Sequence, residues 1–214
     1  MVYYCSLGFH CHSTQLLIRN NLKKESYPFD WIFSNIFIVL DCLENDFSKL
    51  IDKRLYIDYH NQNNKINQNN KINQNQCGHS YYKSNLFPHH DMRKIDNYMY
   101  LLRCIRRFKN ICKMKEPKIF FIIIIDIQIM NNIHENMTNL KNMLNKKTTD
   151  FTLVCFVFTN NQDSNHHYTE INDNIHIVYI NVTSSSNGLE FENEKDNIYV
   201  DDIMKNYVSI DINN

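Results

Sequence analysis

The sequence predicts an α/β fold in which a mostly parallel central sheet carries helices on its faces. Three observations predict it: short apolar runs of strand length, longer amphipathic segments between them, and the alternation of the two along the chain. The chain has 214 residues, which is long for one domain and short for two. We therefore expect a single domain over residues 1–214, with one core and an insertion within it.

The first predicted strand covers residues 2–7, and Gly8 after it permits a sharp turn. A helix is predicted over residues 12–22, so Cys11 lies where a strand leads into a helix N-terminus. The unpaired amides and the positive dipole there stabilise a thiolate, so we expect a lowered thiol pKa at a position suited to a nucleophile. The alternative interpretation is a buried structural cysteine, which is the commoner fate of a free cysteine.

An extended segment is expected around Pro28, because proline biases the residue before it away from helix. Residues 31–50 have apolar side chains at three- and four-residue spacing, which predicts an amphipathic helix with a break near Asn45. The polar tract over residues 61–76 contains the hexapeptide QNNKIN twice, with isoleucine as its only apolar residue. Such a tract buries too little surface to offset its ordering entropy, so we expect a disordered Asn/Gln-rich insertion.

The second half of the chain alternates between the two kinds of segment. Helices are predicted over residues 94–112, 134–144 and 200–207, and strands over residues 118–125, 151–159 and 175–182. His166 and His167 fall in a predicted polar loop. In parallel sheets the functional sites lie beyond the carboxyl ends of the strands, and both Cys11 and Asp126 meet that expectation.

The composition narrows the function classes. Lysine plus arginine and aspartate plus glutamate each number 23, and the basic cluster at residues 103–107 suits the solvated side of a helix, so we expect no nucleic-acid binding. The longest apolar run, residues 119–125, is too short to cross a bilayer, so no membrane partner is expected. Seven scattered cysteines without a CxxC pair or a signal peptide predict reduced thiols and a cytoplasmic location.

The candidate general base for Cys11 is the pair His89-His90, because imidazole titrates near neutral pH and can both accept and return a proton. Asp91 follows His90 directly and is awkward as its orienting partner, because adjacent side chains usually diverge; Asp30 and Asp126 are freer candidates. The alternative is a polar helix N-terminus with Asp91 as its cap.

Asp30 stands between Phe29 and Trp31, and aromatic neighbours draw a carboxylate inward. A buried carboxylate needs a partner, which we expect to be an imidazole or a backbone amide.

Metal and nucleotide chemistry are not favoured. Cys77 and His79 are zinc-type ligands at close spacing, yet no two ligand pairs share the short spacing of structural zinc sites. With only three glycines, neither GxGxxG nor GxxxxGK can be written. We therefore expect no metal and no other cofactor.

Four separated blocks, in order along the chain, carry a resemblance to a known family. They are Ser6-Leu7-Gly8-x-x-Cys11, residues 24–32 with Arg19 ahead of them, Phe87-x-His89-His90-Asp91, and Arg103-x-x-Arg106-Arg107-Phe108. Over roughly residues 2 to 126 the chain resembles the domain-of-unknown-function family catalogued as putative papain-like cysteine peptidases, found in bacteria and large DNA viruses.

The resemblance implies Cys11 as nucleophile and His90 as base, with Ser6 and Gly8 in the cysteine block and Asp30 and Asp91 at family motif positions. A Cys11 thiolate would attack the carbonyl of a peptide or amide substrate, and water would hydrolyse the acyl-enzyme. The amide of Cys11 could supply one oxyanion donor. The resemblance also implies an α+β papain-like fold as the alternative to a parallel sheet, and the host cytoplasm for a viral member. The glutamine that papain-like enzymes place ahead of the nucleophile is missing.

A second function class is a non-catalytic α/β module that binds a carbohydrate or a protein partner. This hypothesis rests on a group of aromatic residues around the same proposed site: Tyr27, Phe29, Trp31, Tyr81, Tyr82 and Phe87. The substitution Cys11→Ala separates the two classes. Ligand binding that it leaves unchanged favours the binding module, whereas loss of activity favours the hydrolase.

Overall fold

The computed structural model describes residues 1–59, 76–125, 132–160 and 164–211, with side chains described as far as residue 205. Nearly all of the predicted Asn/Gln-rich insertion lies outside the described residues, as does Asp126.

A five-stranded sheet forms the centre of the molecule, with the strand order β1-β5-β6-β8-β7. Its strands are β1 (Tyr3–Ser6), β5 (Lys118–Ile124), β6 (Phe151–Asn160), β8 (Ile175–Val182) and β7 (His166–Asn172). The first four run parallel to one another, and only β7 is antiparallel to its neighbour β8. The predicted mixture of helices and strands around a mostly parallel central sheet is confirmed.

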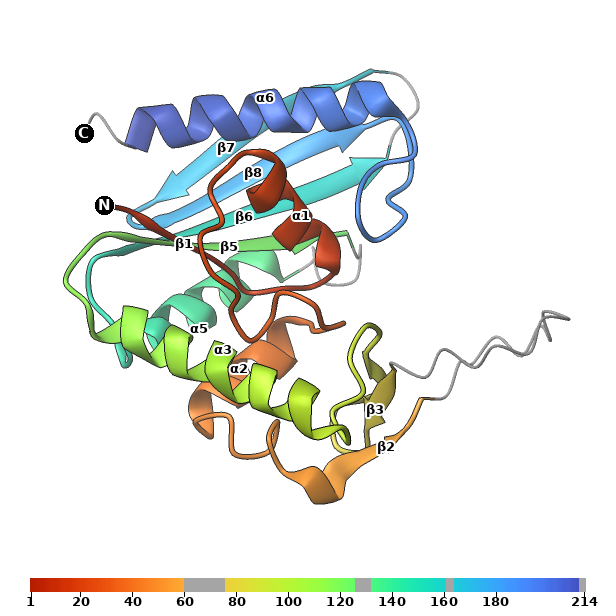
Figure 1. The fold of residues 1–214 in the computed structure, drawn as a ribbon. Coiled ribbons are helices and arrows are strands. Elements are labelled where there is room, and N and C mark those ends of the chain that lie inside the picture. The colour runs from red at the N-terminus through yellow and green to blue at the C-terminus, as the bar shows by residue number, and fades with distance from the viewer. Residues whose placement is uncertain (60–75, 126–131, 161–163, 212–214) are drawn as a thin grey trace, which may run out of the picture.

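Helices cover both faces of this sheet (Figure 1). On one face lie α1 (Cys11–Arg19) and α6 (Glu194–Asp211), and on the other lie α2 (Ile36–Glu44), α3 (Ile95–Lys113) and α5 (Ile133–Asn145). Every residue of β5 is buried, and its side chains alternate between the two apolar clusters. A continuous apolar run is what a parallel strand needs when both of its faces are covered.

A second, antiparallel sheet joins β2 (Tyr56–Asp58), β3 (Cys77–His79) and β4 (Lys83–Phe87) in that order, preceded by the 3-10 helix η1 (Lys53–Leu55). These three strands were not predicted from the sequence. The main-chain amide of Phe33 donates to the carbonyl of Leu86 at 2.9 Å, so β4 is attached to the segment that precedes α2.

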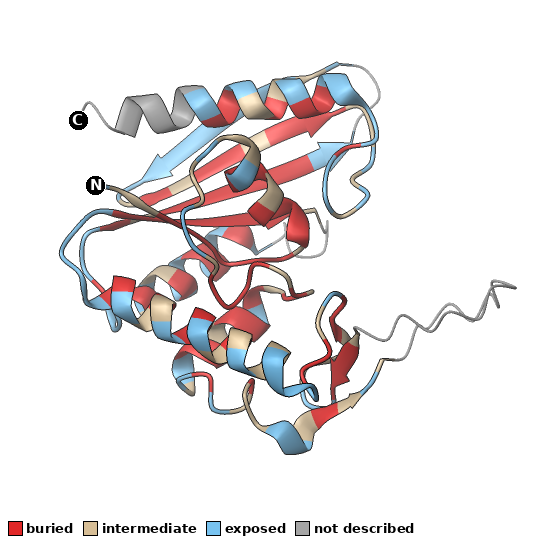
Figure 2. Cartoon of the chain, viewed as in Figure 1, coloured by how far each residue is buried: buried red, intermediate tan, exposed pale blue. Residues whose placement is uncertain are grey.

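Two further elements differ from the prediction. The amphipathic pattern over residues 31–50 is not one helix, because the side chain of Asn35 accepts a hydrogen bond from the amide of Ile38 at 2.9 Å and caps α2. That helix ends before Asn45, as predicted. The histidines of the predicted polar loop instead begin β7, whose seven residues are all exposed (Figure 2). Among the described residues, no helix combines the length and apolar character needed to cross a membrane.

Candidate active site

The turn between β1 and α1 has a strained backbone. Gly8 and Phe9 both have positive φ, at 85° and 94°, a region that is uncommon for any residue with a side chain. A Cβ atom at Gly8 would lie 2.2 Å from Ser34 Oγ, so the close approach of residues 29–34 also requires glycine there. The amide of Phe9 donates to the same Ser34 oxygen at 3.1 Å. The turn is therefore held against the segment that leads into α2.

Ser6 shapes this turn from the carboxyl end of β1. Its Oγ accepts from the amide of Gly8 at 3.1 Å and lies 2.7 Å from Ser13 Oγ. Ser13 Oγ in turn donates to the carbonyl of His10 at 3.0 Å, so the hydroxyl of Ser6 is the donor to Ser13. This buried chain of hydrogen bonds fixes the start of α1 against β1.

Cys11 is the first residue of α1, as the sequence predicts, and 1% of its surface is exposed. The predicted fall in its pKa is wrong. Burial raises the pKa of the thiol to about 11, the amide of Cys11 itself lowers it in part, and the negative charge of Asp30 raises it further. Desolvation of the anion therefore outweighs the favourable field of the helix N-terminus. All seven cysteines are free and buried, so burial alone does not distinguish Cys11 from the others.

Asp30 is completely buried, as its aromatic neighbours predict. Its carboxylate accepts hydrogen bonds from the amide of Tyr27 at 2.8 Å and from Thr14 Oγ1 at 3.2 Å, and it forms an ion pair with Lys23. Of the two expected partners, the backbone amide is the one observed. Burial raises the pKa of Asp30, and the Lys23 ammonium together with these hydrogen bonds opposes the shift without cancelling it.

His90 and Asp91 face different partners. The ring of His90 is half-buried and packs against the ring of Tyr100, with 5.2 Å between the two centroids. It also makes a hydrogen bond with the side chain of Asn97. Burial and the neighbouring His89 lower the pKa of His90. The carboxylate of Asp91 instead accepts from the amide of Arg93 at 3.1 Å and from its Nε at 2.8 Å. Asp91 is therefore not the N-cap of α3, a position that Lys94 occupies.

Asn97 was not singled out from the sequence. Its Nδ2 donates to the main-chain oxygen of Asp91 at 3.1 Å, and its side chain also makes the hydrogen bond to His90, which acts to raise the pKa of that imidazole. An asparagine in the first turn of α3, seven residues after the histidine, is the signal that could have found it. Asn97 thus holds the His90 ring in place of the carboxylate expected from the sequence.

Tyr100 connects His90 to the segment that contains Ser26 and Asp30. It is hydrogen-bonded to Ser26 and Cys104, its pKa is raised first by burial and also by the charge of Asp30, and its ring contacts His90. Asp30 therefore acts electrostatically on both Cys11 and Tyr100. Among the described contacts, no hydrogen bond joins Cys11 Sγ to the ring of His90.

The histidines next to Cys11 point elsewhere. The ring of His10 contacts Phe33, with 5.3 Å between centroids. His12 is fully buried between Phe158 and Phe191, and its Nδ1 lies 2.9 Å from Ser186 Oγ. Burial, followed by the charges of Arg19 and His10, lowers the pKa of His12 to about 3, so it is neutral and serves packing.

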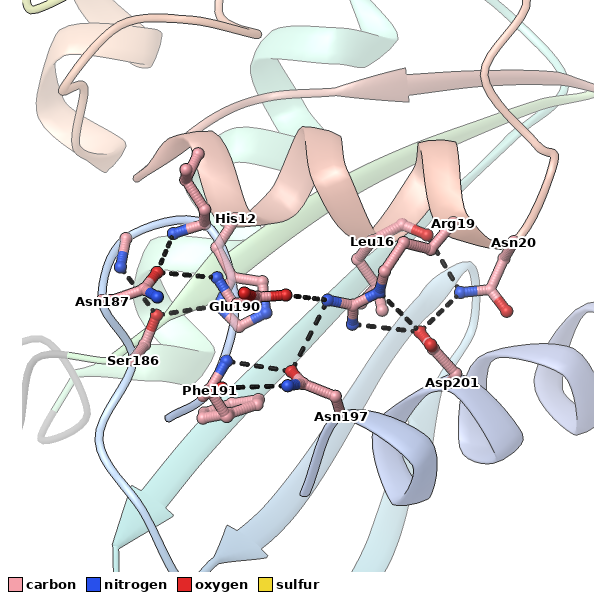
Figure 3. A network of polar contacts seen from close by, with 12 residues as sticks. His12, Leu16, Arg19, Asn20, Ser186, Asn187, Glu190, Phe191, Asn197 and Asp201 are labelled. Atoms are coloured by element: carbon pink, nitrogen blue, oxygen red, sulfur yellow. Dashed lines mark hydrogen bonds and ion pairs between the residues drawn. The ribbon is translucent and has the colours of Figure 1, made fainter. Parts of the chain in front are cut away.

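A polar network ties the far side of α1 to α6 and to the loop before it (Figure 3). Asp201 accepts from Arg19 at 3.1 Å and from Asn20 Nδ2 at 2.9 Å, while Asn197 holds both the amide and the carbonyl of Phe191 at 2.9 Å. Because α1 is fixed on this side, the position of Cys11 at its first turn is fixed as well.

The zinc-type ligands have structural partners. Cys77 Sγ accepts from the amide of Met92 at 3.2 Å, and His79 is bonded to the carbonyl of Lys49 at 3.0 Å and to the amide of Tyr82 at 3.3 Å. Within the part of the chain that the structure describes, no group of three or more histidine, cysteine or acidic side chains could hold a metal ion.

These observations define a class of protein: a mostly parallel α/β fold with a buried cysteine at a strained strand–helix turn and a half-buried histidine in the segment that leads into a second helix. The chain belongs to the family described as "Putative papain-like cysteine peptidase (DUF1796)", whose model matches residues 2–161. The match extends past the four sequence blocks through β5, α5 and β6. No curated protein and no solved structure matches the chain.

Proposed function

We propose that this chain is a cysteine-dependent hydrolase of peptide or amide substrates, with Cys11 as nucleophile and His90 as base. The β1–α1 turn is the observation that carries the proposal. It combines two successive positive φ angles, one at the non-glycine Phe9, with a cysteine at the first position of a helix. Backbone strain of this kind collects at functional sites, and the carboxyl edge of a parallel sheet is where such folds place them.

The surroundings of His90 support its role as base. Its ring is half-buried, is oriented by Asn97 and packs on Tyr100, whose hydroxyl is influenced by the same Asp30 charge that acts on Cys11. A Cys-His-Asn arrangement is the one papain-like enzymes use. Asp30 and Asp91 are proposed as structural supports, since each is already bonded to a neighbouring cation.

The electrostatics favour general-base catalysis over a preformed ion pair. The Cys11 pKa is raised to about 11 and the His90 pKa is lowered, so both groups are neutral at pH 7. As sulfur attacks the substrate carbonyl, the C–S bond forms and the thiol proton passes to His90. The tetrahedral oxyanion then collapses, the C–N bond breaks, and the imidazolium returns the proton to the departing amine. Water, deprotonated by His90, cleaves the thioester and regenerates the thiol.

The test uses p-nitrophenyl acetate, an activated ester that needs no knowledge of the natural substrate. We expect one acetyl group on Cys11, identified by peptide mapping in a mass spectrometer, that is lost with turnover. His90→Ala should slow both formation and loss of this acyl-enzyme by about 100-fold or more, the usual contribution of a general base. His89→Ala is the matched control, because His89 is exposed and contacts Trp31 instead.

Two outcomes would reject the proposal. One is acetylation spread over other residues with none on Cys11. The other is acetylation of Cys11 at the same rate in wild type, His90→Ala and His89→Ala, which would leave the chain as a binding module with an accessible but uncatalysed thiol.

A further inference from the structure

A cavity of about 360 Å³ lies at the C-terminal ends of α2 and α3, close to the residues that follow α5. The residues that line it are Leu43, Asp46, Phe47, Phe108, Lys109, Cys112, Lys113 and Lys147. Tyr100 and Cys112 are twelve residues apart on α3, or about 18 Å at the rise of an α-helix. The cavity is therefore separate from the candidate active site.

The inner wall of the cavity is apolar and well fixed. The ring of Phe47 packs edge-on against that of Phe108, with 5.6 Å between centroids, and also contacts Phe29 at 5.8 Å. Leu43 and Cys112 complete this wall, and all four lining residues belong to one hydrophobic cluster. The wall is thus built from side chains already ordered by the core, which suits an apolar ligand body.

The rim of the cavity is positively charged. Lys109 pairs with Asp46 at 2.6 Å, and Asp46 is the one carboxylate among the lining residues that the structure describes. Lys113 and Lys147 are exposed, and none of the described ion pairs gives either of them a carboxylate partner.

A buried ammonium adds to this charge. Lys118 is 1% exposed, and its Nζ is held by the carbonyl oxygens of Met114 at 2.9 Å and Glu116 at 2.6 Å. Burial raises the pKa of Cys112 to about 11, and the charges of Lys118 and Lys147 act in the opposite direction, so both fields reach the cavity wall. The partial negative charges at helix C-termini, about half a unit each, do not cancel this excess.

We propose that this cavity binds a medium-chain carboxylate, with its apolar tail against Phe47 and Phe108 and its carboxylate between Lys113 and Lys147. The cavity is in the size range of small-molecule sites and combines an apolar wall with a few convergent charges. The pairing of an apolar body with one anionic end matches that wall and that rim. This site is independent of the hydrolase chemistry proposed for Cys11.

The experiment titrates the intact chain with sodium octanoate by ligand-observed NMR and calorimetry. Acetate carries the same head group without the tail, and octylammonium carries the same tail with the opposite charge. We expect saturable one-to-one binding of octanoate, with both comparison ligands at least about tenfold weaker, since each lacks one of the two interactions.

Three variants make the test specific. Lys147→Gln should weaken octanoate binding about 3- to 10-fold, the loss of one partly exposed charge-assisted contact. Asp46→Asn should tighten it, because Lys109 is then released from its ion pair. Lys205→Gln, on the exposed side of α6, is the matched control and should change nothing.

Each alternative result is decisive. Equal binding of octanoate and octylammonium would leave only an apolar crevice, and equal binding of acetate and octanoate would leave only a cationic surface. Either result, or octanoate affinity unchanged by both Lys147→Gln and Asp46→Asn, overturns the proposal. All of these positions are exposed, so unchanged circular dichroism is expected for every variant.

Discussion

The ionisation of Cys11 gives the sharpest test of the site. With a pKa of about 11, only about one Cys11 in 10⁴ is a thiolate at pH 7, whereas an exposed cysteine of pKa about 8.5 is roughly 3% ionised. Ionisation therefore favours the exposed thiol by about 300-fold. The more basic thiolate is intrinsically about 10- to 18-fold more nucleophilic, which leaves a net factor of about 20 to 30. Restricted access adds to it, since 1% of the residue is exposed.

The assay is alkylation by iodoacetamide under native conditions between pH 6 and 10, followed by peptide mapping of each cysteine. The logarithm of the Cys11 rate should rise with unit slope through pH 10, without a plateau. The same peptide in urea provides the control and should level off near pH 8.5. A native Cys11 that levels off at or below pH 8.5 would contradict the burial argument and restore the lowered pKa that the helix N-terminus predicts.

Three more predictions follow from buried polar groups. Lys23→Met should lower the free energy of unfolding by about 3–5 kcal/mol, because it leaves the carboxylate of Asp30 buried and unpaired, and adding Asp30→Asn should restore much of the loss in urea titrations. Burial raises the Asp30 pKa, so in Lys23→Met the deficit should shrink as pH falls toward 4 and persist at pH 7. Gly8→Ala should lower the free energy of unfolding in urea by about 1–3 kcal/mol for the positive φ alone. Adding Ser34→Ala to that variant should recover only the further loss that comes from the clash of the new Cβ with Ser34 Oγ. Asp196→Ala should lower the free energy of unfolding by at least about 3 kcal/mol, because this buried carboxylate accepts four hydrogen bonds or more at the start of α6. Burial raises the pKa of Asp196 but those bonds lower it overall, so thermal melts should show the wild-type advantage shrink as the pH falls below 3.8.

The central sheet could be predicted because its signals are local. The uninterrupted apolar run of β5 and the alternation of apolar strands with amphipathic helices each follow from covering a parallel sheet on both faces. β7 could not be predicted, because all seven of its residues are exposed and its sequence carries no alternation; only pairing with β8 makes it a strand. The three short strands of the small sheet are likewise set by tertiary pairing.

In the candidate site, too, the features with a local sequence signal could be predicted, and those that depend on tertiary contacts could not. Aromatic flanks placed Asp30 in the interior correctly, and the strand–turn–helix pattern placed Cys11 at a helix start. The sign of the Cys11 pKa shift was wrong, because the depth of burial and the nearby Asp30 charge come from segments that only the fold brings together. Asn97 was missed for a related reason: an amide side chain in a helix has no distinctive pattern until its partner, His90, is located.

The edge position of β1 has a consequence for biosynthesis. Among the strands that the structure describes, it pairs with β5 alone, about 110 residues later in the chain. A ribosome adding about 5–20 residues per second delivers that partner only about 5–20 s after β1 has been made. During this interval the turn carrying Cys11 has no sheet to rest on, so its thiol is solvated and reactive in the nascent chain. The oxidation hazard of this cysteine is therefore concentrated in the first seconds of its existence, before the interior closes around it.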